Sequence, residues 1–184
     1  MDCLDDVIEG CKNGDKTMQK ALYDRYSPQY YALCRRYAGN DETAQEILTE
    51  GFLDIFSNIN NYRGTGSLEA WMRVIFLRQA IRVFRRDHKH RQMLTDDLQL
   101  TAARISLPIE QQIDIREAIT LAMRQLNDLQ RQSFNLVAVE GYSFAEAADL
   151  LQMPQHNVKY AYSSARKSLR YLLRTHLGKH YLKQ

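Results

Sequence analysis

The sequence has few cysteines and prolines and no long apolar run. Its 184 residues include three cysteines and three prolines. No CxxC pair occurs, and none of Cys3, Cys11 and Cys34 stands beside a histidine at a metal-ligand spacing, so neither a disulfide framework nor a zinc site is supported. No apolar run approaches the roughly 18 residues of a membrane span, and the acidic N-terminus lacks the features of a signal peptide. We therefore expect a cytoplasmic protein without membrane insertion.

Catalytic motifs are missing too. The chain shows no glycine-rich phosphate loop, no metal triad and no paired nucleophile and base. His88 and His90 lie two residues apart, a spacing that suits no helical metal pair. The sequence thus predicts a protein that is not an enzyme, with no catalytic residues, no bound metal and no cofactor.

What the chain does have is a strong segregation of charge. Residues 63–91 carry eight basic and two acidic side chains, and residues 154–184 carry seven basic and no acidic ones. By contrast, residues 1–62 carry six basic and eleven acidic side chains, and residues 92–153 carry four and nine. Two basic segments on an otherwise acidic chain indicate two contacts with a polyanion and a separate acidic surface for another partner.

Apolar residues recur at helical spacing along most of the chain, and no strand pattern exceeds them, so the predicted class is all-α. The expected helices cover residues 3–12, 16–38, 41–59, 67–87, 109–125, 128–140 and two more within 141–174. Pro28 is expected to kink the second helix or to begin a new one capped by Ser27. Residues 88–109 fit no period and are interpreted as a tether between two helical domains.

Residues 141–174 have the pattern of a helix-turn-helix. Ser143 and Glu146 form a capping box, and Pro154 separates a short helix from a longer one. The longer helix buries a stripe and leaves polar and basic residues on its other side, as expected of a recognition helix in the major groove. The alternative is a solvated helical hairpin. The buried stripe comprises Val158, Tyr162, Ala165, Leu169 and Leu172.

Two further helical faces carry charge of one sign. Glu46, Glu50 and Asp54 recur every four residues on the helix at 41–59, so their carboxylates lie on one side of it. Such a face is either merely solvated or binds a basic partner. After the glycine-containing loop 60–66, the next helix presents Arg73, Arg78 and Arg82 and then two more arginines, a face suited to phosphates and unpaired DNA. A basic surface helix without a ligand is the alternative.

Four segments in order resemble bacterial sigma factors of the extracytoplasmic-function (ECF) type in the sigma-70 family, over about residues 21–173. ETAQEILTEGFLDIF is similar to the family's DAEDLVQEVFLRLW-like helix, and YRGTGSLEAWMRVIFLRQAIRVFRR to FxGxGSFxAWLxRIAxNxAxDxxRR. LNDLQRQSFNLVAVEGYSFAEAADLL resembles LPxxxRxVFLLxxxEGLSYEEIAEIL, and HNVKYAYSSARKSLR resembles GTVKSRLxRARxxLR. The resemblance implies region 2 at residues 1–88, a linker at 89–109 and a region 4 helix-turn-helix at 110–184.

The resemblance also implies partners and site residues. Core RNA polymerase, through its β′ clamp helices and β flap, would bind Glu46, Thr49, Glu50 and Asp54. The promoter −10 element would meet Tyr62, Arg63, Ser67, Trp71, Arg78, Arg82, Arg85 and Arg86. The −35 element would meet Gln155, His156, Asn157, Lys159, Tyr160, Ser163, Ser164, Arg166 and Lys167. An anti-sigma factor is a further partner that the family implies.

The chain departs from the family pattern at several of these positions. Thr49 replaces the usual Gln, and Arg78 and Arg82 replace the usual Asn and Asp. Ala161 and Ser164 replace basic residues, which is expected to remove phosphate or guanine contacts. The rival hypothesis is a dimeric helix-turn-helix regulator that binds operator DNA without acting as a polymerase subunit; the second basic helix argues against it.

Overall fold

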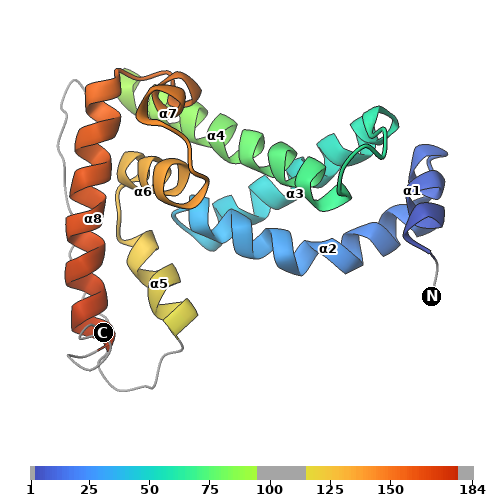
Figure 1. The fold of residues 1–184 in the computed structure, drawn as a ribbon, viewed down its shortest axis with the longest axis horizontal. Coiled ribbons are helices and arrows are strands. Elements are labelled where there is room, and N and C mark those ends of the chain that lie inside the picture. Colours follow the sequence, from blue (N-terminus) through green and yellow to red (C-terminus); the bar gives the residue numbers. More distant parts are fainter. Residues whose placement is uncertain (1–2, 95–114, 178–184) are drawn as a thin grey trace. The chain divides into compact units, whose positions relative to one another are not determined.

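The computed structural model describes residues 3–94 and 115–177, and every element in these ranges is helical (Figure 1). The predicted all-α class is therefore confirmed for the described chain. In order, the elements are α1 (Leu4–Lys12), α2 (Lys16–Tyr37), α3 (Asp41–Asn58), the 3-10 turn η1 (Ile59–Asn61), α4 (Leu68–Leu94), α5 (Ile115–Arg124), α6 (Asp128–Phe134), the π-helical turn η2 (Asn135–Val139), α7 (Phe144–Leu151) and α8 (Gln155–Leu177).

Contacts between residues divide the chain into two units. The first comprises residues up to Cys34 together with Asp41–Val83. The second comprises Arg35–Asn40 together with the described residues from Phe84 onward. Each unit has its own buried core.

Stacked aromatic side chains form the core of the first unit. Tyr30 lies on Phe76 with ring centroids 4.3 Å apart, and Phe52 meets the edge of Phe76 at 5.3 Å. Gly51 lies directly against the same ring, because a Cβ added there would overlap Phe76. α3 and α4 therefore approach each other closely at this point, and only glycine fits.

Helix α2 is unbroken, so of the two alternatives predicted for Pro28 the new helix capped by Ser27 is wrong. Pro28 lies inside the helix, although proline removes one backbone hydrogen bond and crowds the preceding turn. Tyr26, Tyr30 and Cys34 are at most 4% exposed on this helix. Their burial stabilises α2 on both sides of the proline and outweighs the local penalty.

Helix α4 is longer than expected. It runs to Leu94, into the segment interpreted as a tether, because residues 88–94 contain no glycine or proline to end it. The remainder of that tether and the start of the helix predicted at residue 109 lie outside the described residues. The buried side of α4 includes Leu68, Met72, Phe76 and Ala80, which repeat every four residues, together with Leu77, Ile81 and Phe84, whereas Val74 is 46% exposed.

Helix α8 is the element on which the second unit is built, with α5, α6 and α7 all packed along it (Figure 1). Ala122, Met123 and Leu126 pack against Ala165 and Leu169 of α8. Close to the start of α8, Tyr162 stacks on Phe134 at 6.1 Å and meets Phe144 edge-on at 5.3 Å. The predicted apolar stripe of α8 thus faces the core.

Polar side chains of α6 and its π-turn are buried in the second unit. Arg131 is 3% exposed, and its Nε donates to the Tyr37 carbonyl at 3.0 Å. The Gln132 amide donates to the same carbonyl at 3.0 Å, and the Asn135 amide donates to the Arg36 carbonyl at 2.7 Å. The last carbonyls of a helix have no partner within that helix, so these side chains satisfy the C-terminal end of α2.

The helix-turn-helix has the predicted local chemistry. The Ser143 hydroxyl accepts from the Glu146 N–H at 3.2 Å, and the Glu146 carboxylate accepts from the Ser143 N–H at 2.8 Å. The same reciprocal box, formed by Asn127 and Gln130, begins α6. Gln152, between α7 and α8, takes the left-handed conformation with φ +55°, where glycine is the usual residue.

Candidate nucleic-acid and protein interfaces

The loop between η1 and α4, where −10 contacts were predicted, folds back on itself. The Tyr62 hydroxyl donates to the Gly66 carbonyl at 2.5 Å, and its ring lies 5.6 Å from that of Trp71. The Ser67 hydroxyl accepts from the Ala70 N–H at 3.1 Å and so caps α4, as predicted. Arg63 is exposed. The loop therefore presents a half-buried tyrosine and tryptophan beside an exposed cation.

The first turn of α4 is anchored to α2 by two tyrosines. The Tyr26 hydroxyl donates to the Glu69 carboxylate at 2.9 Å, and the Tyr30 hydroxyl donates to the Glu69 carbonyl at 2.7 Å. A backbone N–H and the Tyr26 hydroxyl hold the pKa of Glu69 below its ordinary value. These bonds fix the start of α4 and hence the end of the loop.

The predicted −10 arginines of α4 differ in their surroundings. Arg78 and Arg82 are both exposed, and the Arg82 guanidinium lies 3.8 Å from the Asp54 carboxylate. The Arg85 guanidinium donates to the Leu150 carbonyl, with its Nε at 2.8 Å. Arg86 pairs with Asp87 at 3.0 Å. Three of these four arginines thus have a partner within the chain.

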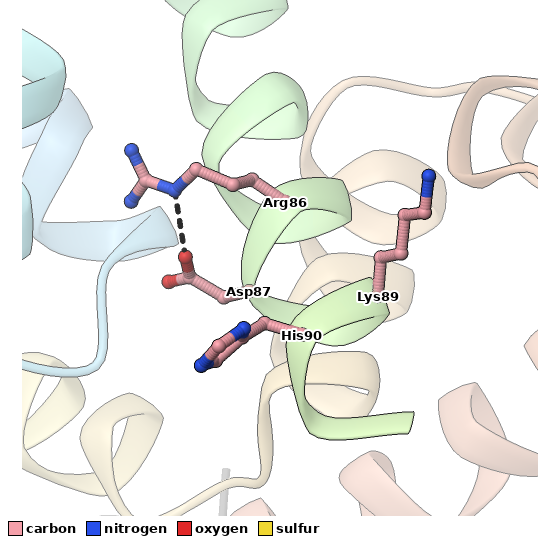
Figure 2. Close-up of a pocket in the computed structure, with 4 residues that line it drawn as sticks. All are labelled: Arg86, Asp87, Lys89 and His90. Carbon is pink, nitrogen blue, oxygen red and sulfur yellow. Dashed lines mark hydrogen bonds and ion pairs between the residues drawn. The ribbon is translucent and has the colours of Figure 1, made fainter. Parts of the chain in front are cut away.

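Further along α4, Arg86 and Asp87 line a surface pocket together with Lys89 and His90 (Figure 2). His88 and His90, predicted to lie in the tether, are both on α4, and the His88 ring is 5.5 Å from that of Phe84. Among residues 3–94 and 115–177, no three His, Cys, Asp or Glu side chains gather as a metal site requires.

The face of α3 predicted to bind polymerase mixes acidic, polar and apolar groups. Glu50 and Thr49 are exposed, and Glu46 is half-buried. The Thr49 hydroxyl donates to the Gln45 carbonyl of its own helix at 2.9 Å. Leu53 is 54% exposed on this face and was missed. The signal for it was its spacing, because Leu53 stands three residues after Glu50 and seven after Glu46.

The side of α8 opposite the core carries most of the predicted −35 residues. All are exposed except Ser164, with Tyr160 63% exposed. Lys159 lies 5.9 Å from the Phe144 ring and Arg166 lies 5.8 Å from the Tyr162 ring, so aromatic faces hold both cations beside the helix. The exposed set is Gln155, His156, Asn157, Lys159, Tyr160, Ser163, Arg166 and Lys167.

Two positions of α8 contribute to packing. Ser164 is half-buried, and its hydroxyl accepts from the Gln130 amide at 2.9 Å. Ala161 is 4% exposed. The expectation that alanine there removes a DNA contact is therefore wrong, because position 161 lies on the buried side next to Val158 and Ala165.

Both halves of the chain match models of one family. Residues 22–90 match Sigma-70 region 2, and residues 116–169 match Sigma-70, region 4. The chain belongs to the sigma-70 family. The first match contains α3, the loop and most of α4, and the second contains α7 and α8 as far as Leu169.

Relatives of this sigma factor are of the ECF type. The ECF RNA polymerase sigma factor SigM of Mycobacterium tuberculosis is 25% identical over 160 residues, covering 87% of this chain and 79% of SigM. SigM of Bacillus subtilis is 24% identical over 153 residues, covering 82% of this chain and 92% of SigM. SigW of the same organism is 25% identical over 178 residues, covering 91% of this chain and 95% of SigW. These matches confirm the predicted ECF-type resemblance.

A solved structure of the sigma factor RpoE in complex with the anti-sigma factor NepR, from Bartonella quintana, is also similar. It is 19% identical with a TM-score of 0.48, covering 84% of this chain and 96% of that one. A dimeric operator-binding regulator is not favoured for this sigma factor, because the region 2 match accounts for the helices that such a regulator does not need. No helix in the described part of the chain is long and apolar enough to cross a bilayer.

Proposed function

We propose that this ECF-type sigma factor directs core RNA polymerase to promoters through three surfaces: the acidic face of α3, the loop and basic face of α4, and the exposed side of α8. The observation that carries the proposal is the match of both region 2 and region 4 on one chain. We assign region 2 to residues 1–88, the linker to 89–109 and region 4 to 110–184.

The α3 surface is proposed to bind the β′ clamp helices of the polymerase. Glu50 supplies an exposed carboxylate, Glu46 a half-buried one, and Leu53 an exposed apolar side chain. An apolar group ringed by charge is typical of a protein interface, because burial of Leu53 favours association while the carboxylates select a basic partner. Thr49 lies between them.

The −10 element is proposed to lie against the loop and the exposed side of α4. Tyr62 and Trp71 offer aromatic faces for unpaired bases, and Arg63 and Arg78 offer exposed cations for phosphates. Ser67 holds the end of the loop. Arg85 and Arg86 already have partners in the chain, so they are weaker candidates for direct contact.

The −35 element is proposed to receive the exposed side of α8 in its major groove. His156, Asn157 and Tyr160 supply neutral or titratable donors and acceptors, and Lys159 and Lys167 supply phosphate contacts. Ser164 supports this helix from the inside through Gln130. Specificity follows from holding both DNA-binding regions on one polymerase, because tethering raises the effective concentration of the second contact.

The remaining assignments follow from this role. The protein is proposed to act as a non-catalytic initiation factor in the cytoplasm, where RNA polymerase works. An anti-sigma factor is proposed as a second protein partner, as the family resemblance implies. The β flap is the proposed contact of region 4 on the polymerase.

Run-off transcription with purified core polymerase tests the proposal. Promoters are first identified by mapping transcript 5′ ends after overexpression of the chain. We expect the chain to restore initiation from these templates and E50R, at a polymerase-facing position, to fail. If the chain binds the promoter duplex as a dimer but restores no initiation, it is an operator-binding regulator instead.

A further inference from the structure

Asp54, expected on the polymerase-binding face, is engaged inside region 2. Its carboxylate Oδ2 accepts a hydrogen bond from the Gln79 amide of α4. The Arg82 guanidinium, one turn further along α4, lies 3.8 Å from the same oxygen. One carboxylate of α3 thus holds two side chains of α4.

Gln79 has little freedom to find another partner. It is 1% exposed, and its amide is enclosed by the crossing of α3 and α4. Three residues before Asp54 on α3 is Gly51, and three residues before Gln79 on α4 is Phe76, the pair at which the helices approach too closely for a Cβ. Leaving a buried amide without an acceptor destabilises the fold, so the packing of the two helices requires Asp54.

We propose that Asp54 is a positioning residue that fixes α4 on α3 through Gln79 and Arg82, and that neither Asp54 nor Arg82 makes the partner contact expected from its charge. The inference rests on the proposed function, because it joins the helix that binds polymerase to the helix that holds the −10 element. Through this contact, docking of α3 on the polymerase sets the placement of α4.

A charge-exchange cycle tests the inference. D54R, R82D and the double variant D54R/R82D are compared for affinity to core polymerase, for permanganate reactivity of unpaired −10 thymines at saturating sigma factor, and for thermal unfolding without polymerase. Each single variant brings like charges together at the crossing, so we expect about tenfold less strand opening with polymerase affinity unchanged within twofold. We expect the double variant to open promoters better than either single variant, because the ion pair is restored, but to stay below wild type, because arginine at position 54 leaves the Gln79 amide without its acceptor.

Two controls separate this role from direct contact. D54N keeps an acceptor for Gln79 and is expected to open promoters within threefold of wild type. E50R lies on the same helix at a proposed polymerase contact, so its loss of polymerase affinity is not recovered in E50R/R82D. These controls show whether recovery is specific to the Asp54–Arg82 pair.

The inference is overturned if D54R loses polymerase affinity and D54R/R82D does not regain it, since Asp54 would then be a polymerase contact. It is also overturned if D54R is neutral while R82D fails alone and in the double variant, since Arg82 would then contact DNA. Failure of the double variant to regain folding lost in a single variant counts against the pair as well. Failure of the wild-type chain to restore initiation would overturn the proposed function alone, because the unfolding cycle still reports the pair.

Discussion

The hydroxyl of Tyr26 on α2 donates a 2.9 Å hydrogen bond to the carboxylate of Glu69 in the first turn of α4. Tyr26 is 4% exposed, so the bond lies at the edge of the aromatic core. It connects the core of region 2 to the first turn of α4, which follows the loop proposed to hold the −10 element.

Loss of this bond is expected to weaken region 2 in a pH-dependent way. Y26F is expected to lower the free energy of unfolding by about 1 kcal/mol at pH 7. In the folded state the pKa of Glu69 lies below its ordinary value of 4.5. The stabilisation is therefore fully present at pH values above about 4.5 and is lost as the pH falls through the lowered pKa of the folded state. Urea unfolding of wild type, Y26F and E69Q over a pH series checks this, and a difference between wild type and the variants that persists at the lowest pH would contradict it.

Charge reversal on the exposed face of α3 is expected to abolish polymerase binding without unfolding the chain. In E50R the new cation meets a basic partner, so affinity for core polymerase should fall at least tenfold, since like-charge contacts cost several kcal/mol. D149R is a matched control, because Asp149 is an exposed carboxylate on α7. Co-purification with core enzyme measures both. Equal binding by E50R and wild type would remove Glu50 from the interface.

A cation early in α8 is expected to contribute a phosphate contact. K159A should weaken binding to a −35 duplex and reduce the slope of log affinity against log salt by about 0.9. H156A should weaken −35-dependent transcription as well. R174A removes an exposed arginine on the same helix outside the proposed reading side. Fluorescence anisotropy over a salt series measures the slopes, and equal slopes for K159A and R174A would argue against the proposed orientation.

The three cysteines are expected to differ sharply in reactivity. Cys3 is exposed, whereas Cys11 and Cys34 are buried. Burial raises the pKa of the Cys34 thiol to about 12, so almost no thiolate forms at neutral pH. Brief iodoacetamide treatment followed by mass spectrometry should modify Cys3 alone, and all three only after unfolding. Rapid modification of Cys34 in the native chain would contradict its place in the core.

Glycine in place of Gln152, in the turn of the helix-turn-helix, is expected to stabilise the fold. Gln152 has φ +55°, a conformation that costs a residue with a side chain roughly 1 kcal/mol. Q152G should raise the free energy of unfolding by about that amount, and Q152A should bring no such gain. Thermal unfolding of the two variants decides the point, and a destabilised Q152G would show that the glutamine side chain contributes contacts that outweigh the strain.

Local chemistry made much of this fold predictable. The capping boxes at Ser143 and Asn127 involve residues three apart, so the sequence displays both partners. The buried stripe of α8 follows from helical spacing in the same way. The continuity of α2 through Pro28 went against a local rule, because burial of the aromatic side chains around it decides the outcome.

Side chains whose partners are distant in sequence were not predictable. Arg131 looks like a surface residue of α6, yet its guanidinium is buried against the Tyr37 carbonyl 94 residues away. Asp54 looks like part of an acidic face until α4 supplies Gln79. Charge patterning alone does not distinguish a carboxylate that serves a partner from one that serves a neighbouring helix.

The π-helical turn after α6 has a consequence for the length of the chain. The Glu140 N–H bonds to the Asn135 carbonyl five residues earlier at 2.9 Å, one residue more than an α-helical turn contains. Region 4 therefore has a built-in single-residue insertion at this point. A deletion within Asn135–Val139 would let an ordinary helix continue with the later residues in nearly the same angular position, because the π turn only accommodates the extra residue. A deletion from the α-helical turns of α6 would instead turn every later residue by about 100° around the helix axis, so the angular setting of the helix-turn-helix tolerates a shorter chain at the π turn and not before it.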